Sequence, residues 1–277
     1  LNCLFIDPFP MVHDVRQRFE CQNLDGKGRG LIAIQPIESN TVISTVTPEI
    51  AVLYSDFAKS HCSRCFIATS ANLCADCESF ILCVGCETDE VMKHLHSIEC
   101  SLFCELPADT RKSDTDYVRF VLRYCALVQT NDPRRTQIDS HCINRELQST
   151  EFLNWANAYA LLFVNYFGDR LGVTLDQLID VLCIVQVNAF GFPFTKTETL
   201  GWSLQSELAL INHDCAPNCC IGYSEESQGS MAARTTRRIE PGEELTIAYR
   251  DRRSTPNIRA QIFDRYRFQC TCQLCCE

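Results

Sequence analysis

Residues 212–218 of this chain read NHDCAPN, residues 238–249 read RIEPGEELTIAY, and residues 270–275 read CTCQLC. The second stretch holds the turn Pro241-Gly242 and then the apolar run Leu245–Tyr249, which together predict a turn followed by a short β-strand. A tyrosine at the end of such a run is usually a packed sheet residue. The third stretch has cysteine spacing typical of a metal site. This half of the chain therefore predicts short strands that lead to a cysteine cluster.

The N-terminal half holds a denser group of metal-ligand pairs. They are Cys62-x2-Cys65, Cys74-x2-Cys77, Cys83-x2-Cys86 and His96-x3-Cys100. Each spacing lets two side chains face one ion, and eight tetrahedral donors predict two Zn²⁺ ions. His94 competes with His96 as a ligand, but only His96 stands four residues before Cys100. Ordinary buried cysteines are the alternative interpretation of these pairs.

Composition narrows the class of protein. The chain has 20 cysteines in 277 residues and no signal-peptide pattern, which favours metal thiolates in a reducing compartment over disulfides. It has no run of eighteen apolar residues, so no membrane span is predicted. The formal net charge of −10 argues against a nucleic-acid-binding zinc protein, which needs a basic face. A protein substrate that carries positive charge fits better.

Strands and helices alternate along the chain in blocks. The glycine-punctuated turn at residues 24–30 precedes the strand-like runs Leu31–Ile34 and Thr41–Val46. Residues 114–187 have helical periodicity, with Thr174 as an expected N-cap, and Met231–Arg234 again predicts a strand. A short helix is expected within residues 256–277. The chain shows neither internal repeats nor low-complexity segments.

The chain resembles the SET-and-MYND (SMYD) family of protein-lysine methyltransferases over nearly its whole length. The resemblance rests on the three quoted stretches and their order, on the opening glycine turn and on the inserted metal pairs. The resemblance implies an α+β fold with SET-domain β-sheets around a pseudoknot-like C-terminal segment. An inserted MYND zinc module, a helical SET insert and a post-SET zinc site complete it. The expected boundaries are 1–58 for the N-terminal SET portion, 59–102 for the MYND module, 103–187 for the helical insert, 188–253 for the SET core and 254–277 for the post-SET segment.

The same resemblance implies how the metal ligands are shared among three zinc ions. The MYND cross-brace assigns Cys62, Cys65, Cys83 and Cys86 to one ion, and Cys74, Cys77, His96 and Cys100 to the other. The family usually has three residues between the third pair, and this chain has two, so Cys86 departs from the pattern. Cys215, Cys270, Cys272 and Cys275 are expected to hold the third ion, with Cys276 as an alternative to Cys275.

Catalytic roles also follow from the resemblance. Tyr249 matches the catalytic tyrosine, and Phe192 and Tyr266 are expected to complete a lysine channel. A register slip of two in this alignment selects Phe190 in place of Phe192. The residues that match contacts to S-adenosylmethionine are Lys27, Gly28, Arg29, Asn212, His213, Tyr249 and Phe268.

The resemblance implies transfer of a methyl group to a histone or non-histone protein lysine in the nucleus, the cytoplasm or both. The protein is expected to be a monomer that binds a protein substrate and, at the MYND module, a proline-rich peptide. Two departures from the family are Asp214, where a serine is usual, and the end of the chain soon after Cys275, without the helical C-terminal domain of longer members. A catalytically weak scaffold that binds protein partners is the alternative function.

Overall fold

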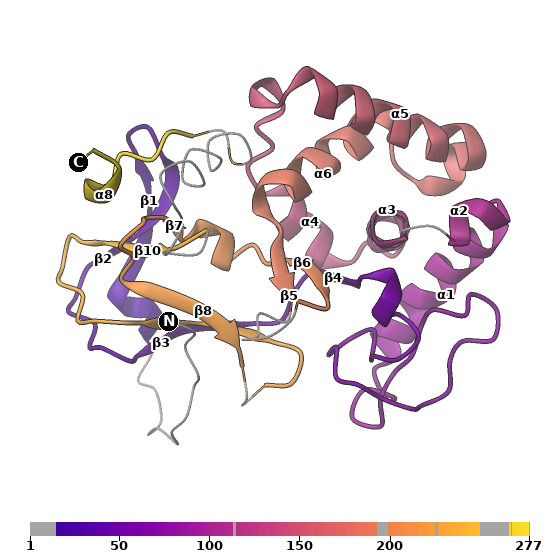
Figure 1. Ribbon diagram of the computed structural model, residues 1–277, viewed down its shortest axis with the longest axis horizontal. Coiled ribbons are helices and arrows are strands. Elements are labelled where there is room, and N and C mark those ends of the chain that lie inside the picture. Colours follow the sequence, from indigo (N-terminus) through magenta and orange to yellow (C-terminus); the bar gives the residue numbers. More distant parts are fainter. Residues whose placement is uncertain are drawn as a thin grey trace. The chain divides into compact units, whose positions relative to one another are not determined.

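The computed structural model describes residues 15–112, 115–192, 199–224, 227–249, 266 and 268–276 (Figure 1). These residues form two compact units. The first unit holds the described residues up to Thr47 and from Ser206 onward, and it consists mainly of strands. The second unit holds those from Pro48 to Gln205 and is mainly helical. The predicted α+β class is confirmed.

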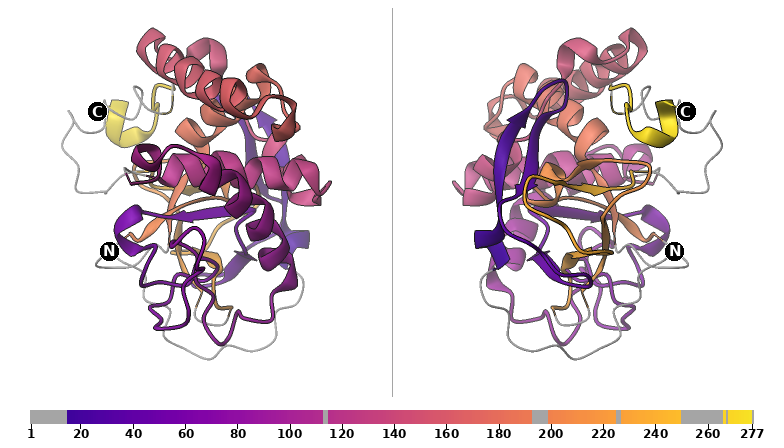
Figure 2. Two further views of the ribbon diagram at one scale, coloured as in Figure 1. Left: turned by 90° about the vertical axis from the view of Figure 1, so that its right-hand side faces the viewer. Right: turned by 90° about the vertical axis from the view of Figure 1, so that its left-hand side faces the viewer.

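A four-stranded sheet forms the centre of the first unit. Its strands, in the order β1-β2-β10-β7, are β1 (Phe19–Leu24), β2 (Gly28–Ala33), β10 (Glu244–Ile247) and β7 (Asn212–His213). The β1–β2 hairpin is the indigo ribbon pair in Figure 2. Strand β10 pairs antiparallel with β2 and parallel with β7, so the sequence stretch before Tyr249 lies directly beside the Asn212-His213 pair.

Glycines shape the hairpin and allow its close approach to the Asn212 side chain. Gly26 lies in the turn and Gly28 follows it, with φ of +69° and +73°, in the left-handed region where a side chain would be strained. Gly30 faces Asn212, and a Cβ added to Gly30 would lie 2.7 Å from the Asn212 Nδ2 atom. The glycine turn expected from the sequence therefore brings the backbone of β2 close to the Asn212 side chain.

A second sheet belongs to the same unit. It contains β3 (Val42–Val46), β9 (Met231–Thr235) and β8 (Cys219–Tyr223), all antiparallel, in the order β3-β9-β8. Two 3₁₀ turns, Val15–Arg18 and Leu208–Leu210, and the short helix α8 (Gln273–Cys276) complete the unit. The helix expected within residues 256–277 and the expected pseudoknot-like path fall mostly on residues outside the described ranges.

The second unit is built from helices around one small sheet. The sheet has the order β4-β6-β5, with β4 (Ile50–Leu53), β6 (Gly201–Leu204) and β5 (Phe190–Phe192) antiparallel. The helices are α1 (Glu90–Glu105), α2 (Ala108–Lys112), α3 (Asp116–Gln129), α4 (Pro133–Asp139), α5 (Thr150–Phe167) and α6 (Leu175–Asn188). Short 3₁₀ turns span Ser55–Phe57, Arg145–Leu147 and Gly168–Leu171.

Helix α3 is the centre of the helical core. Its residues from Val118 to Leu127 are all buried, which a helix achieves only when neighbours cover every face (Figure 1). Helix α6 begins where the sequence predicts. Thr174 caps it by accepting a hydrogen bond from Gln177 N, and the Gln177 side chain accepts one from Thr174 N. The predicted helical block is confirmed.

Helix α1 joins the metal-ligand region to this core. Asp89 caps the helix by accepting a hydrogen bond from Met92 N. The buried residues of α1 include both His96 and core apolar side chains such as Leu102 and Phe103. The predicted boundary at residue 102 falls inside this helix. The domain boundaries otherwise stay predictions.

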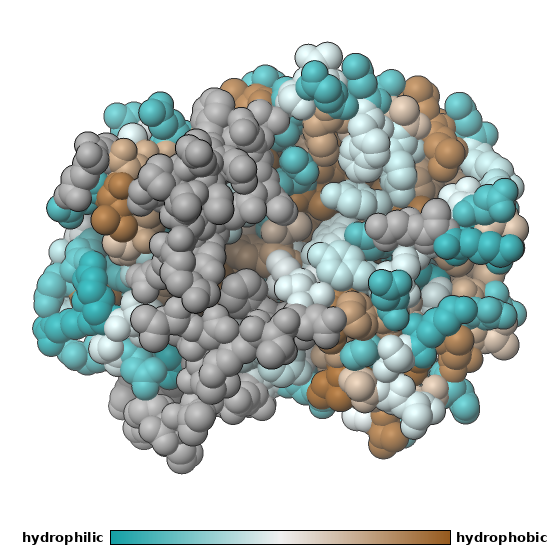
Figure 3. Space-filling view, in the orientation of Figure 1, coloured by the Kyte–Doolittle hydropathy of each residue, from teal (hydrophilic) through white to brown (hydrophobic). Residues whose placement is uncertain are grey.

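The surface shown in Figure 3 has apolar and polar residues interspersed over the helical unit. Among the described residues, no single helix has both the length and the apolar composition to cross a membrane. The two helical segments Thr150–Leu171 and Leu175–Asn188, which meet at a sharp bend, have that length and apolar composition only when they are taken together.

Candidate active site and metal centres

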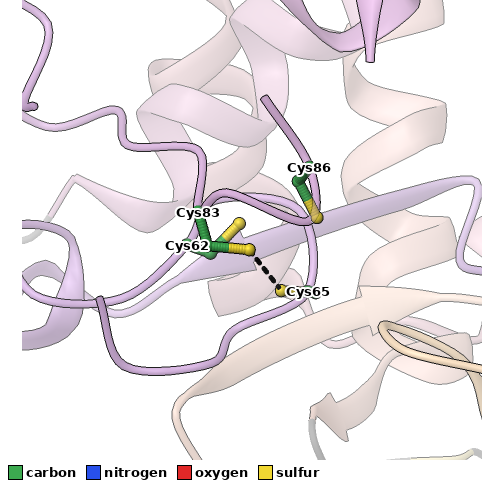
Figure 4. Close-up of side chains that lie close together, drawn as sticks. All are labelled: Cys62, Cys65, Cys83 and Cys86. Atoms are coloured by element: carbon green, nitrogen blue, oxygen red, sulfur yellow. Dashed lines mark hydrogen bonds between the residues drawn. The ribbon is translucent and has the colours of Figure 1, made fainter. Parts of the chain in front are cut away.

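Four cysteines of the second unit converge in its loop region. The sulfurs of Cys62, Cys65, Cys83 and Cys86 all lie within 4.8 Å of one another, and all four residues are buried (Figure 4). The structure therefore brings together the four residues that the cross-brace assigned to one ion. Cys86, which departs from the family spacing, lies among them.

The second predicted group also comes together. It consists of Cys74, Cys77, His96 and Cys100, again with ligand atoms within 4.8 Å of one another. His96 turns its Nε2 atom toward the sulfur of Cys77 at 3.8 Å, whereas the competing His94 is exposed. The His96 ring stacks on Phe80 with centroids 3.7 Å apart, which fixes its orientation. Burial lowers the pKa of His96 to about 4, so the ring is held in the neutral form that binds metals.

The distances between donors match a tetrahedral zinc site. A Zn–S bond of about 2.3 Å places two tetrahedral sulfurs roughly 3.8 Å apart. The Sγ–Sγ distance is 3.6 Å between Cys65 and Cys83 and 3.8 Å between Cys74 and Cys100. Disulfide-bonded sulfurs would lie only about 2 Å apart. The residues of both groups therefore fit zinc.

A third group forms in the first unit from distant parts of the chain. It consists of Cys215, Cys270, Cys272 and Cys275, with sulfurs within 4.8 Å of one another. Cys215 Sγ lies 4.0 Å from Cys270 Sγ and 3.5 Å from Cys275 Sγ, so the tail of the chain returns to the NHDC stretch. Cys275 is exposed, unlike any ligand of the other two groups. The side chain of Cys276, the alternative ligand, lies outside the described residues.

Whether the cysteines of the three metal groups are thiols or thiolates depends on a bound metal cation. Burial, and then the charge of Cys62, raise the pKa of Cys86 to about 12. Burial likewise raises the pKa of Cys270 to about 11. A divalent cation among the sulfurs reverses this preference, because a coordinated thiol loses its proton outright. Metal binding at these groups is thus coupled to proton release.

Beside the third group, four rings make an aromatic cluster. Tyr249 follows β10, and its ring centroid lies 4.7 Å from that of Tyr266 and 6.2 Å from that of Phe268. The His213 ring lies 5.3 Å from the Tyr249 ring. The Tyr249 hydroxyl donates a hydrogen bond to Ile211 O at 3.2 Å. The structure thus brings together Tyr249 and Tyr266, expected in the lysine channel, with His213 and Phe268, expected at the cofactor.

The predicted cofactor residues meet around a glutamate that the sequence analysis missed. Glu244, in β10, accepts a hydrogen bond from Lys27 Nζ at 2.6 Å and one from Asn212 Nδ2 at 2.9 Å. Asn212 Nδ2 also donates to Arg29 O at 3.1 Å. Lys27 and Glu244 are 217 residues apart in sequence, so only strand pairing reveals the contact. The only signal in the sequence was a carboxylate directly before the predicted strand Leu245–Tyr249.

Asp214 occupies the position of the usual serine without disturbing the local turn. Its Oδ1 atom accepts a hydrogen bond from Ala216 N at 2.7 Å, and its backbone N–H donates to Ile247 O at 3.0 Å. A serine hydroxyl makes the same kind of turn contact. The substitution therefore keeps Cys215 in place.

Phe192 belongs to the second unit. It is fully buried in β5, and its ring packs against Phe66 with centroids 4.8 Å apart and nearly perpendicular planes. Phe190, the alternative, lies on the same strand and is half-buried. The channel role of Phe192 stays a prediction, because its relation to Tyr249 and Tyr266 involves the other unit.

A buried ion cluster beside the second metal group was also missed. Glu99 is fully buried on α1 and binds Arg119 Nη1 at 2.8 Å and Arg123 Nε at 2.9 Å, both from α3. Burial alone would raise the pKa of Glu99, but the charges of Arg123 and Arg119 outweigh it and hold that pKa below its usual value. The only signal for this cluster in the sequence was the presence of charged residues at positions 99, 119 and 123, within otherwise apolar helical patterns.

Comparison with known proteins adds the following similarities. Residues 28–250 match the family of SET domains. The chain is 29% identical over 265 residues to the N-lysine methyltransferase SMYD2 of Gallus gallus and 29% identical over 262 residues to that of Homo sapiens. Each match covers 90% of this chain and 58% of the relative, so the chain spans less than two thirds of these relatives.

Among solved structures, the chain matches the SET domain of LSMT bound to lysine and AdoHcy. It matches 94% of this chain and 54% of that chain, at 16% identity and a TM-score of 0.42. The structure of Rubisco LSMT bound to AdoMet matches 92% of this chain and 52% of that chain, at 16% identity and the same TM-score of 0.42.

Proposed function

This chain belongs to the SET-domain family, and from that premise we propose that it is a protein-lysine N-methyltransferase that uses S-adenosylmethionine. Relatives that are named N-lysine methyltransferases support the resemblance to the SET-and-MYND family. The observation that carries the proposal is the setting of Tyr249. Its hydroxyl is fixed on a backbone carbonyl inside a cluster of aromatic rings, beside the residues expected to hold the methyl donor.

The aromatic cluster suits the reacting amine. A lysine side chain has a pKa of about 10.4, so at neutral pH almost all of it is protonated and not nucleophilic. Rings such as those of Tyr249 and Tyr266 form an apolar wall that disfavours the ammonium form and promotes release of its proton to water. The same ring faces stabilise a cationic methyl donor.

Tyr249 orients the reactants through its oxygen. Because the hydroxyl proton is engaged with Ile211 O, the oxygen lone pairs are left to accept from the amine or from the methyl group. This fixes the direction of approach, which is the main requirement of in-line transfer. Bound S-adenosylmethionine supplies an activated methyl group on a sulfonium, and the residues of the chain supply position and solvent exclusion.

The polar residues suit the amino-acid end of the methyl donor. Lys27 and Arg29 are cationic donors on the glycine turn, and a carboxylate is their natural partner. The Asn212 amide adds an acceptor oxygen from β7, since its Nδ2 atom already donates to Arg29 O and to Glu244. Glu244 ties Lys27 and Asn212 together, so their side chains are held in one arrangement before any ligand arrives.

The substrate we propose is a lysine of a histone or of another protein, and the compartment we propose is the nucleus or the cytoplasm. Zinc thiolates need reduced cysteines, which supports a reducing compartment. Fractionation of cells that express the tagged chain tests the compartment, and recovery only from a secreted fraction would contradict it.

The proposal that the MYND module binds a proline-rich peptide draws support from exposed apolar residues on that module. Val84 is 79% exposed and Ile67 is 44% exposed. Fluorescence titration with a labelled proline-rich peptide tests it. We expect saturable binding that Val84→Ser weakens, and equal binding to a scrambled peptide without proline would contradict it.

The test of the main proposal is methyl transfer from isotopically labelled S-adenosylmethionine to histones and to a whole-cell extract, with zinc content measured on the same sample. Tyr249→Phe removes the hydroxyl and should lower the rate of methyl transfer at least about 100-fold. Loss of the group that orients the reacting amine and methyl group can cost that much in rate. Tyr166→Phe is the matched control, since the Tyr166 hydroxyl also donates to a backbone carbonyl, Glu105 O at 2.8 Å, but in the helical unit.

The outcomes separate the two functions considered. Transfer to lysine that survives Tyr166→Phe and is lost in Tyr249→Phe supports the enzyme, and the labelled band identifies the substrate. Folded, zinc-loaded protein that transfers no methyl group to any substrate favours the scaffold function instead.

A further inference from the structure

His213 makes two side-chain contacts that the expected cofactor role does not explain. Its Nδ1 atom accepts a hydrogen bond from the backbone N–H of Tyr249 at 3.0 Å. Its Nε2 atom lies 3.3 Å from Cys215 Sγ, a member of the third metal group. The residue is only 6% exposed, so both contacts are shielded from water. One imidazole thus joins a metal ligand to the tyrosine that is proposed to be catalytic.

Strand pairing fixes this geometry. Strands β7 and β10 run parallel, with Ile247 opposite His213, and Asp214 N donates to Ile247 O at 3.0 Å. Tyr249 lies two residues beyond the paired Ile247, and Cys215 lies two residues beyond His213. The imidazole therefore lies between the two segments where they leave the sheet.

The first contact determines which nitrogen carries the proton. A backbone N–H can only donate, so the Nδ1 atom of His213 must present its lone pair to Tyr249 N. A neutral ring then carries its proton on Nε2, which donates to Cys215 Sγ. The doubly protonated ring is incompatible with this arrangement, because both nitrogens would be donors.

We infer that His213 is a positioning residue that couples the third metal group to the placement of Tyr249. With metal bound, Cys215 is a thiolate and accepts a charge-assisted hydrogen bond from Nε2. That bond fixes the ring plane, which in turn holds the Tyr249 backbone where its hydroxyl reaches Ile211 O. This inference rests on the proposed function for the catalytic role of Tyr249, but the coupling itself does not.

Two substitutions of His213 each remove one of its two contacts and keep the other. His213→Asn retains an acceptor oxygen near the Nδ1 position and loses the donor toward Cys215. His213→Gln retains a donor near the Nε2 position and loses the acceptor for Tyr249 N. Residues that orient metal ligands affect metal affinity or activity by about 10- to 100-fold when they are changed.

We therefore expect His213→Asn to lower zinc affinity at the third group by about 10- to 100-fold while kcat is better retained. We expect His213→Gln to retain zinc and to lower kcat by a similar factor, with KM for S-adenosylmethionine changed less. Zinc release is followed with a chromogenic chelator. Unchanged zinc affinity in His213→Asn, or unchanged kcat in His213→Gln, would overturn the coupling.

The tautomer gives a readout that needs no activity. In ¹⁵N-labelled protein, the protonated and bare ring nitrogens of a histidine have well-separated shifts, and the chain has only 6 histidines to assign. His141→Asn, a buried histidine of the helical unit, serves as the control for assignment. The zinc-loaded protein should show the His213 proton on Nε2, and removal of zinc should change that signal.

A His213 signal that is the same with and without zinc would overturn the inference. Because this measurement involves no methyl transfer, failure of the proposed function would leave it unaffected. A zinc-dependent His213 signal in a protein without transferase activity would sustain the coupling and refute only the catalytic role.

Discussion

The metal groups of the two units are built in opposite ways. In the helical unit, the eight ligands come from residues 62–100, and all but Cys74 are buried. In the strand unit, Cys215 joins cysteines 55 to 60 residues further along the chain, and one of them is exposed. A local, buried metal group substitutes for a hydrophobic core in a short segment. A long-range, half-exposed group instead fastens residues 270–275 beside the aromatic cluster.

Their electrostatic surroundings differ as well. The second group has three thiolates around one Zn²⁺, a net charge of −1 when occupied. The buried cluster of Glu99, Arg119 and Arg123 carries two positive charges and one negative, a net +1, so the two balance. Burial raises the pKa of Cys77, and the charge of Arg119 opposes that rise. The helical unit is therefore expected to need its metal to fold, whereas the strand unit needs its metal to function.

The largest expected effect contrasts one ligand from each region. Cys77→Ser should abolish cooperative unfolding of the helical unit, because structural zinc supplies about 10–16 kcal/mol in small zinc domains, as much as the whole stability of a typical domain. Cys272→Ser should leave the fold intact, lower zinc from about three to about two ions per chain and abolish binding of S-adenosylmethionine. Circular dichroism, zinc analysis and calorimetry measure these effects.

Cys142→Ser, which changes an exposed thiol outside all three groups, is the control for that pair and should alter none of the readouts. If Cys272→Ser unfolded the protein as fully as Cys77→Ser, the distinction between a folding metal and a functional metal would be lost.

The next effect concerns the buried ion cluster. Glu99→Gln leaves two buried guanidinium groups without their carboxylate and should cost about 3–5 kcal/mol in the free energy of unfolding at pH 7. The pKa of Glu99 is lowered in the folded state, so its contribution is present above the unfolded pKa of about 4.3 and is lost as pH falls through the lower folded value. The difference in the free energy of unfolding between wild type and Glu99→Gln should therefore narrow as the pH falls from about 4.3 through the folded pKa of Glu99.

Urea unfolding at several pH values measures that difference. Glu105→Gln is the matched control, since Glu105 also lies on α1 and binds both terminal nitrogens of Arg170, but in solvent. It should shift the unfolding midpoint far less. An equal loss in the two variants would show that burial of the cluster does not matter.

A smaller effect is expected at the start of α6. Thr174→Ala removes the capping box and should destabilise the helical unit by about 1 kcal/mol. Ser149→Ala removes the single cap bond from Phe152 N at the start of α5. Thermal unfolding of the two variants compares a reciprocal cap with a simple one, and a neutral Thr174→Ala would contradict the assignment.

The smallest effect is expected at the position that departs from the family. Asp214→Ser should change kcat/KM by less than roughly 2-fold, about 0.5 kcal/mol, because the Asp214 side chain already makes the turn contact to Ala216 N. A tenfold gain in cofactor affinity, measured by calorimetry, would instead show that the Asp214 carboxylate disfavours the methyl donor.

Sequence spacing identified the metal ligands because each pair is a local feature. Two cysteines separated by two residues can face one ion whatever the rest of the fold does. The same reasoning identified the N-cap Thr174 and the glycine turn before β2. It could not reveal Glu244 or Glu99, since the partners of these carboxylates lie 20 to 217 residues away.

The sequence by itself determined the family, the class of metal site and the identity of Tyr249 as a candidate, because all three depend on residue types at short, fixed separations. Only the tertiary structure decided which groups meet around those residues. Pairing of β10 with both β2 and β7 brings Lys27, Asn212 and Glu244 together and places His213 between Cys215 and Tyr249. Such contacts depend on strand register between distant segments, which no local pattern specifies.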